Sequence, residues 1–243
     1  MSGLSELITR GRFNLRRRIA PYPRLFMPLM RRREAHDGHI VDDSTEIMIE
    51  GFPRSGNTFA VAAFELAQGR PVSIARHLHA PAHVIEGVRR RLPVMVVVRD
   101  PVQAVGSLVI RHPGVTVADG LREYIAFHTH LKRWSEGILF ASFPRFTSDF
   151  GSVIGDVNSR FGTDFARFEQ TDANLAAVYQ RLDEMDAGDR TRRAGDPGAT
   201  VARPQDARQA AKARLEPEFR RITPAGLVAE ARRAASELVD LEP

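Results

Sequence analysis

The sequence predicts an α/β protein, a three-layer sandwich in which helices cover both faces of a central parallel sheet. Two observations favour this class. The run PVMVVV at 93–98 is almost wholly apolar, which is typical of a strand covered on both faces. Short apolar runs also alternate with helical patterns between residues 46 and 161, as in parallel sheets. With 43% hydrophobic residues among 243, the chain can bury a substantial core.

The first expected strand covers 46–52 (EIMIEGF), and a Pro-Arg-Ser-Gly-Asn turn leads from it into a helix over 58–67. The further expected elements are a strand at 71–75, a helix at 81–91, a strand at 93–98, a helix from Pro101 to about 112, a helix at 118–136, a strand at 138–143, a helix at 147–161, and helices at about 206–221 and 224–238. No internal repeat is evident.

Composition divides the chain into three parts. Residues 1–45 form a basic N-terminal arm, residues 46–186 form the α/β core, and residues 187–243 form a linker or lid followed by the two C-terminal helices. The change after Ala187 is marked by GDRTRRAGDPGATVARPQ, which is rich in glycine, proline and charge.

The positive charge is concentrated in the arm. Residues 1–33 hold nine arginines and one glutamate, whereas the whole chain carries a net charge of only +5. The remainder is therefore slightly acidic, and we do not expect a nucleic-acid partner.

The arm allows two interpretations. Pro21, Pro23 and Pro28 prevent one continuous helix, and apolar residues alternate with arginine clusters. Residues 10–33 therefore suit a surface segment that lies on anionic lipid. The alternative is a lead-in segment that docks on the core or is poorly ordered.

The chain has no cysteine, which excludes disulfides and thiolate metal sites and fits a reducing compartment. No run of eighteen apolar residues is present, and the first residues lack the pattern of a secretory signal. We expect a cytoplasmic protein whose arm could reach the inner face of the membrane.

A glycine-containing loop at residues 51–58 (GFPRSGNT) joins the first strand to the first helix. This context suits phosphate binding by backbone N–H groups and a helix N-terminus. The spacing matches the triphosphate loop G-x-x-x-x-G-K-[ST] except that Asn57 replaces the lysine. The positive charge is supplied instead by Arg54, so the expected ligand is anionic without being a magnesium-bound triphosphate. A purely structural tight turn is the alternative.

FPRSGNT resembles the 5′-phosphosulfate loop of sulfotransferases that use 3′-phosphoadenosine 5′-phosphosulfate (PAPS). The resemblance implies a sulfotransferase fold related to the P-loop nucleotide kinases. It also implies that Arg54 contacts the sulfuryl group and the bridging oxygen, and that Ser55, Gly56, Asn57 and Thr58 hold the 5′-phosphate.

A second motif, VVVRDPVQAVGS, places Arg99 at a strand end and Ser107 eight residues later. It is similar to the 3′-phosphate motif of the same family, and a guanidinium fork with a hydroxyl suits a dianionic phosphate. The resemblance covers roughly residues 46–168. The family's C-terminal Arg-Lys-Gly segment is absent, and Arg203 is the weak substitute in that region.

Two histidines are candidates for the base that takes the proton of the acceptor. Arg76-His77-Leu78-His79 follows the second strand, where many cytosolic sulfotransferases carry Thr-His-Leu-Pro with a catalytic histidine. Gapless alignment from Arg99 favours His77, which is the first choice from the sequence, whereas the proline that follows favours His79. A metal site built on the His-x-His pair lacks a third ligand nearby.

Other residues are alternatives for the same role. A carboxylate base such as Glu65 or Glu123 is the alternative if neither histidine serves, and a solvated loop is the structural alternative for the pair. His112, His128 and His130 lie on helical stretches and suit structural roles.

The expected function is PAPS-dependent transfer of a sulfuryl group to a hydroxyl, or less readily an amine, with PAPS as co-substrate and no metal. Small-molecule, glycan and lipid acceptors remain open, as does the oligomeric state. Two alternatives stand beside it. One is a degenerate P-loop kinase with Asp100 as its magnesium ligand, and the other is a non-catalytic nucleotide-binding scaffold whose arm docks on a membrane.

Overall fold

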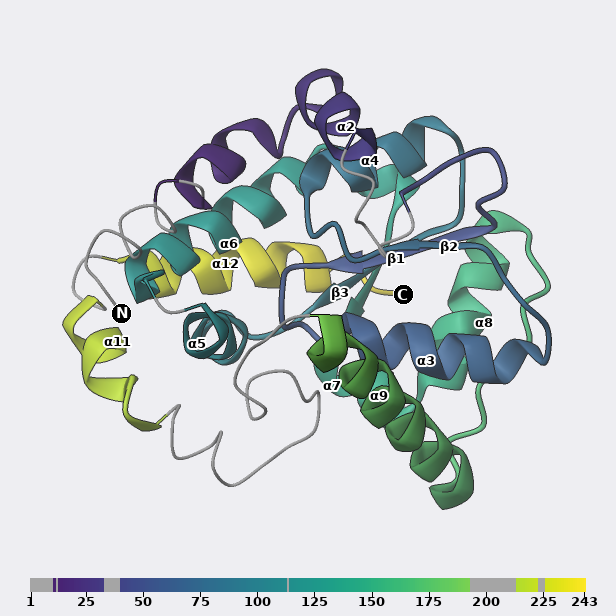
Figure 1. Ribbon diagram of the computed structural model, residues 1–243. Helices are drawn as coiled ribbons and strands as arrows, with labels where there is room; N and C mark the ends of the chain where they lie inside the picture. The colour runs from purple at the N-terminus through teal and green to yellow at the C-terminus, as the bar shows by residue number, and fades with distance from the viewer. Residues whose placement is uncertain (1–10, 12, 33–39, 113, 193–212, 223–225) are drawn as a thin grey trace.

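The computed structural model describes residues 11, 13–32, 40–112, 114–192, 213–222 and 226–243. Four parallel strands form a sheet in the order β2-β1-β3-β4 at its centre (Figure 1). The strands are β1 Ile47–Gly51, β2 Ile74–Arg76, β3 Val94–Val98 and β4 Leu139–Ser142. The predicted α/β class with a central parallel sheet is confirmed.

Both faces of this sheet are covered, which explains why the strands read as continuous apolar runs. Alternate side chains point to opposite faces. On β1, Ile47 and Ile49 pack into one core, and Met48 packs into the other. On β3, Met95 and Val97 pack into the same core as Ile47. Val94, Val96 and Val98 pack into the same core as Met48.

Two groups of helices form the outer layers. The Ile47 side is covered by α3 Asn57–Gln68, α7 Phe143–Ser148, α8 Phe150–Phe161 and α9 Asp172–Arg192. The Met48 side is covered by α2 Pro23–Arg31, α4 Pro81–Arg89, α5 Pro101–Arg111, α6 Val117–Lys132, α11 Glu216–Ile222 and α12 Leu227–Val239. A short 3-10 turn, η1 Ser135–Gly137, precedes β4.

The predicted helices differ from the structure in several places. Residues 206–212 of the helix predicted at 206–221 lie outside the described residues, and a turn at 214–215 precedes α11 within that range. The helix predicted over 147–161 is two helices, since Asp149 ends α7 and accepts a hydrogen bond from the N–H of Ser152 at 3.0 Å as the N-cap of α8. The helix predicted to end at 136 ends at Lys132. The helix α9 was not predicted at all.

The basic arm is packed on the core along its described length. Residues 13–19 are helical, the chain breaks at 20–22, and α2 follows with Pro28 inside it. Phe26, Met27 and Met30 are buried, and the helix lies against α4. These residues form the core-docking segment that was one of the two alternatives for the arm.

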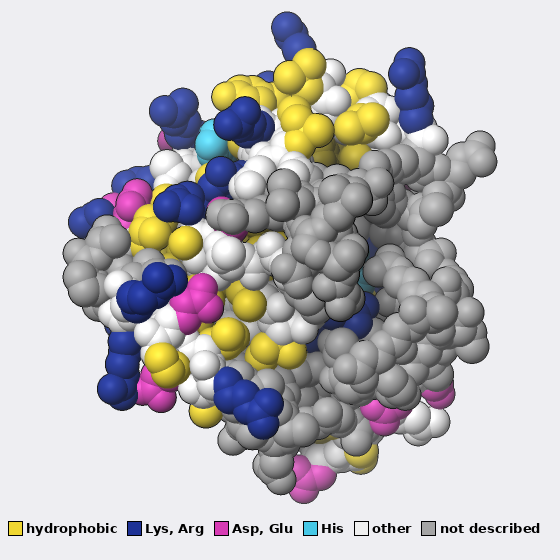
Figure 2. Space-filling view, turned by 60° about the vertical axis from the view of Figure 1, so that its left-hand side comes forward, with side chains coloured by type: hydrophobic (Ala, Val, Ile, Leu, Met, Phe, Trp, Pro, Cys, Tyr) yellow, Lys and Arg dark blue, Asp and Glu magenta, His cyan; other side chains and the backbone are white. Residues whose placement is uncertain are grey.

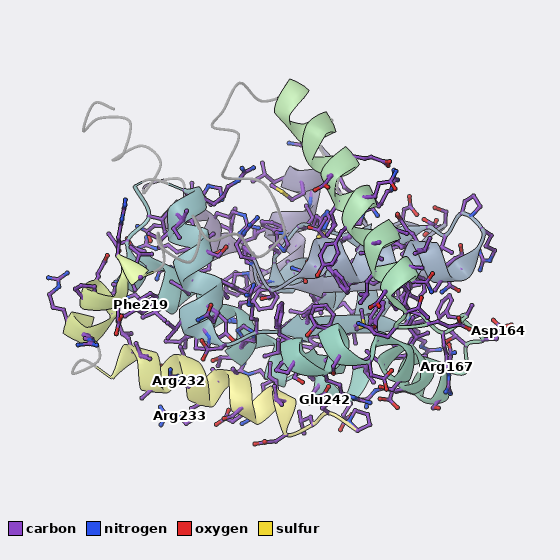
Figure 3. All side chains as sticks on the ribbon, turned by 90° about the horizontal axis from the view of Figure 1, so that it is seen from below. Asp164, Arg167, Phe219, Arg232, Arg233 and Glu242 are labelled. Atoms are coloured by element: carbon purple, nitrogen blue, oxygen red, sulfur yellow. The ribbon has the colours of Figure 1, made fainter. Side chains whose placement is uncertain are left out.

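The C-terminal helices close the Met48 side. Phe219 on α11 and the buried face of α12 join this core, and α12 lies alongside α6 (Figure 1). Just beyond α12, Glu242 accepts hydrogen bonds from the N–H of Ser142 at 3.1 Å and from Arg145 at 3.2 Å (Figure 3). The linker or lid predicted after residue 187 lies largely outside the described residues. In the described part of the chain, no helix is long and apolar enough to cross a membrane.

Candidate active site

The strand order places a topological switch point at the carboxyl ends of β1 and β3. The chain leaves β1 through α3 on one face toward β2, and it leaves β3 through α5 and α6 on the other face toward β4. Connections that diverge in this way mark the switch point where open parallel sheets bind ligands. Arg54 follows β1 and Arg99 follows β3, so the two sequence motifs meet here.

The loop after β1 has a tightly constrained backbone. Arg54 has φ 68° and Gly56 has φ 100°. A Cβ at Gly56 would lie 2.7 Å from Cζ of Phe146, so only glycine fits. Directly after it Asn57 begins α3, which directs the helix N-terminus at the loop.

Two polar side chains line this turn from within. Ser55 is fully buried, and its hydroxyl has no hydrogen-bond partner among the described residues. Asn57 donates from Nδ2 to the carbonyls of Phe52 at 3.1 Å and Gly51 at 3.4 Å. The amide of Asn57 therefore braces the loop, whereas the hydroxyl of Ser55 remains able to bond an anion. Thr58 is half-buried in the first turn of α3.

Arginine side chains from both strand ends converge beside the loop. Arg54 donates from Nε to Oγ of Ser107 at 3.1 Å, which links the loop to the second turn of α5. Arg99 donates from Nη1 to the carbonyl of Arg54 at 2.9 Å, and its guanidinium lies 4.1 Å from the centre of the Phe143 ring. The hydroxyl of Tyr124 donates a hydrogen bond to the carbonyl of Arg99 at 2.5 Å. Two cations and a hydroxyl are thereby gathered from separate elements.

The histidine pair lies on the loop after β2, at the same edge of the sheet. His77 has φ 63° and His79 has φ 47°. Together with Arg54 they are three of the four non-glycine residues with positive φ in the described chain. Such backbone strain is concentrated at functional sites in proteins.

His79 is held beside the phosphate loop. Its Nδ1 donates to the carbonyl of Gly51 at 2.9 Å and lies 3.4 Å from Nδ2 of Asn57. This contact fixes the ring and leaves Nε2 as the nitrogen that can accept a proton. Burial and, more weakly, the charges of Arg16 and Arg54 lower the pKa of His79, although Glu50 opposes them. A neutral imidazole at neutral pH follows. The ring of His77 lies 5.8 Å from that of His79.

A buried carboxylate that the sequence analysis did not single out supports the histidine loop. Glu50, fully buried on β1, accepts hydrogen bonds from the N–H groups of Leu78 at 2.8 Å and His79 at 3.2 Å and from Nδ1 of His83 at 2.8 Å. The N–H of Val41 donates to Nε2 of His83, so Nδ1 carries the ring proton. Burial alone would raise the pKa of Glu50, but the hydrogen bond from His83 opposes this effect and the pKa is lowered to about 2. Glu50 is thus a carboxylate that ties the loop to β1.

The arm contributes a second support. Arg16 donates from Nη1 to Oε1 of Glu123 at 3.1 Å and from Nη2 to the carbonyls of Leu78 and His79. A small cavity opens beside this contact. It is lined by His79 and Glu123 together with Arg17, Pro21 and Phe127. The arm therefore forms one wall of the space next to the candidate base.

Glu123 leads to a prediction about pH and stability. Burial raises its pKa to about 7, despite the opposing charges of Arg16 and Arg17. A carboxyl whose pKa is higher in the folded protein binds more protons when folded, so stability falls as pH rises from about 4.5 to about 7. We expect Glu123→Gln to remove this loss, which amounts to up to about 3 kcal/mol.

The measurement is the melting temperature of both proteins between pH 5 and pH 8. The difference, variant minus wild type, should increase with pH. Phe127→Leu changes the same cavity without removing a charge, so it should change the melting temperature by the same amount at pH 5 and at pH 8. Parallel curves for Glu123→Gln and the wild type would contradict the raised pKa.

The remaining predicted residues take other places. Glu65 pairs with Arg76 at 2.6 Å. Asp100 caps α5 by accepting from the N–H of Gln103 at 3.0 Å, and it lies 3.6 Å from Arg232 of α12. Arg203 lies outside the described residues. No group of three or more histidine, aspartate or glutamate side chains that could hold a metal ion occurs in the part that the structure describes.

The three histidines that suit structural roles, His112, His128 and His130, lie on or beside helices. His128 is buried and its Nδ1 contacts the carbonyl of Tyr124 at 2.7 Å, while burial lowers its pKa to about 4. His130 contacts the carbonyl of Ala126 at 2.6 Å, and His112 ends α5.

No protein-family model matches the chain, and no curated protein matches it. Among solved structures, the chain is similar to the crystal structure of mouse sulfotransferase SULT7A1 complexed with PAP. The TM-score is 0.39 and the sequence identity 16%, over 62% of this chain and 69% of that chain. This likeness is too distant to assign an activity, so the function has to follow from the residues of this chain.

Proposed function

We propose that this protein is a sulfotransferase that moves a sulfuryl group from PAPS to a hydroxyl, or less readily an amine, of an acceptor. The observation that carries the proposal is the cluster of Arg54, Ser107 and Arg99 at the carboxyl ends of β1 and β3. It supplies two guanidinium groups and a hydroxyl beside a loop that suits phosphate. Phosphate dianions favour such charge-assisted donors.

The residues present fit the nucleotide of PAPS. The hydroxyl of Ser55 is buried without a partner among the described residues, and the turn at Gly56 has no room for a Cβ. With the N–H groups that begin α3, they would hold the 5′-phosphate. Arg99 and Ser107 would hold the 3′-phosphate, and Arg54 would lie at the sulfuryl group. When bound, PAPS supplies the sulfuryl group on an activated phosphate.

The chemistry needs a base and a cation, and the site offers both. His79 takes the proton of the acceptor hydroxyl on Nε2 as the acceptor oxygen bonds to sulfur. The bond from sulfur to the bridging oxygen breaks, and the electron pair stays on the phosphate, where Arg54 stabilises it. Glu50 and Arg16 position the loop that carries His79, through the backbone at residues 78 and 79.

A kinase with magnesium fits the arrangement less well. Asn57 uses the position of the usual lysine to brace the loop carbonyls. Asp100, the candidate magnesium ligand, caps α5 and lies near Arg232. Both residues thus have structural partners that explain their presence.

Nucleotide binding tests the proposal before any acceptor is known. We expect 3′,5′-adenosine bisphosphate to bind about ten- to a hundredfold more tightly than adenosine 5′-monophosphate. A charged hydrogen-bond partner is worth roughly 1.5–3 kcal/mol, and only the bisphosphate offers the 3′-phosphate. Isothermal calorimetry on the full chain measures both affinities, and a thermal-shift series adds ATP with magnesium.

Ser107→Ala should reduce this preference. Ser236→Ala removes a hydroxyl from an exposed position on α12 and should leave it unchanged. Equal affinity for the two nucleotides would overturn the 3′-phosphate site. Stronger stabilisation by ATP with magnesium would favour the kinase instead.

A further inference from the structure

The outer side of the arm carries an unusual concentration of exposed apolar side chains. Six large hydrophobic residues are exposed in the described chain, and four of them lie in the arm. These are Leu15, Tyr22, Leu25 and Leu29, with exposed fractions of 61%, 55%, 61% and 42%. Scattered single leucines need no explanation, but four on one short segment mark an interaction surface.

The same segment is strongly cationic. Residues 11–32 contain no aspartate or glutamate, and Arg18, Arg24, Arg31 and Arg32 are exposed. Glu86, which faces α2 from α4, lies 4.0 Å from Arg31. Figure 2 shows hydrophobic side chains gathered at the top of the molecule, where α2 lies, with Lys or Arg side chains around them. We call this surface, Leu15, Tyr22, Leu25 and Leu29 with these four arginines, the arm face.

The arm face has a rigid backing. Phe26, Met27 and Met30 on the opposite side of α2 are buried in the core. The carbonyl of Ala20 accepts a hydrogen bond from the N–H of Ala82 at 2.8 Å, which fixes the break before α2 to the start of α4. The exposed apolar side chains therefore belong to a segment that is fixed on the core. Leu25 and Leu29 are held outward by α2, a folded amphipathic helix.

We propose that the arm face binds an anionic lipid surface. Its leucines and Tyr22 would enter the boundary between headgroups and acyl chains, and its arginines would pair with headgroup phosphates. A second copy of the chain fits less well, because a shared face would bring arginine against arginine. Nucleic acid would satisfy the arginines but would not bury the leucines.

The experiment is sedimentation of the full chain with vesicles of phosphatidylcholine alone and of phosphatidylcholine mixed with phosphatidylglycerol. We expect binding to the anionic vesicles, weakened by added salt, and little binding to the neutral ones. Because burial of leucine contributes strongly, Leu25→Glu/Leu29→Glu should lower the affinity more than tenfold. Arg24→Gln/Arg32→Gln should lower it about fivefold for each arginine.

Matched variants separate a specific face from a general change in charge or hydrophobicity. Leu66→Glu/Leu241→Glu alters the two other exposed leucines, and Arg181→Gln/Arg220→Gln removes two exposed arginines elsewhere. Both controls should bind as the wild type does. Equal binding to neutral and anionic vesicles, or an equal loss in the controls, would overturn the proposal. A dimer that the Leu25→Glu/Leu29→Glu variant abolishes, without vesicle binding, would assign the face to a second copy instead. Melting curves verify that each variant folds. If Leu25→Glu/Leu29→Glu fails to fold, Arg24→Gln/Arg32→Gln still tests the proposal.

Discussion

His79→Ala is expected to lower the rate of sulfuryl transfer by roughly a hundredfold or more while nucleotide affinity changes little. General-base catalysis typically contributes about 10²–10⁴ in rate, and Nε2 of His79 is the nitrogen left to accept a proton. The contact of Nδ1 with the carbonyl of Gly51 places the ring beside the phosphate loop. Since the pKa of His79 is lowered below its ordinary 6.5, transfer should decline only as the pH falls below about 6.5.

His77→Ala is the matched control, because His77 shares the loop and also has positive φ. It should change the Michaelis constant for the acceptor at most. His79→Asn guards against a merely structural effect, since asparagine tolerates positive φ and keeps a donor near Gly51. It should bind nucleotide normally and still transfer slowly. A slow His77→Ala with a normal His79→Ala would assign the base to His77. Near-normal turnover of both on an identified acceptor would point to Glu123, which lines the same cavity.

The sequence was sufficient for those parts of the fold that depend on local patterns. Apolar runs identified all four strands, and proline and glycine positions identified the starts of α3, α4 and α5. The helix α9 was missed although Leu175, Val178, Tyr179 and Leu182 recur at the spacing of one helix face. Among its described side chains, Val178 and Leu182 are buried, and it is held mainly by packing on α3.

The candidate site was predictable where its residues form short motifs and not where they meet across the chain. The loop at 51–58 and the pair Arg99 and Ser107 are local spacings. Arg16 reaches the carbonyl of His79 over 63 positions, and Glu50 meets the same loop over 29, so no local spacing reveals either contact. Glu50 did leave one signal. A carboxylate within an apolar strand has to find donors, because an unpaired buried charge is very costly.

The arm shows why composition alone left two interpretations open. Alternating apolar and arginine residues describe both a segment that docks on the core and one that lies on lipid. In the structure the two sides of α2 divide these roles, with Phe26, Met27 and Met30 inward and Leu25 and Leu29 outward. Which residues take which side depends on where the break at 20–22 sets the phase of the helix, and that break is fixed by the contact with Ala82.

Arg54→Ala is expected to reduce the turnover of PAPS by about 10²–10³ while the affinity for 3′,5′-adenosine bisphosphate falls much less. Loss of one donor that stabilises developing charge typically costs this much in turnover. The desulfated product keeps its 5′-phosphate but lacks the group that Arg54 is proposed to stabilise, so the loss should lie in the transition state. Single-turnover release of the bisphosphate from PAPS gives the rate, and calorimetry gives the affinity.

Arg91→Ala is the matched control for Arg54→Ala. Arg91 has φ 59°, close to the 68° of Arg54, so alanine meets the same backbone strain in both variants, but Arg91 lies outside the candidate site. The control should therefore transfer at the wild-type rate even if its melting temperature changes. Arg54→Lys should recover part of the rate, because the charge is kept while the guanidinium donor to Ser107 is lost. If Arg54→Ala left turnover unchanged while nucleotide affinity collapsed, Arg54 would be a binding residue alone, and the charge that stabilises the leaving phosphate would have to come from Arg99.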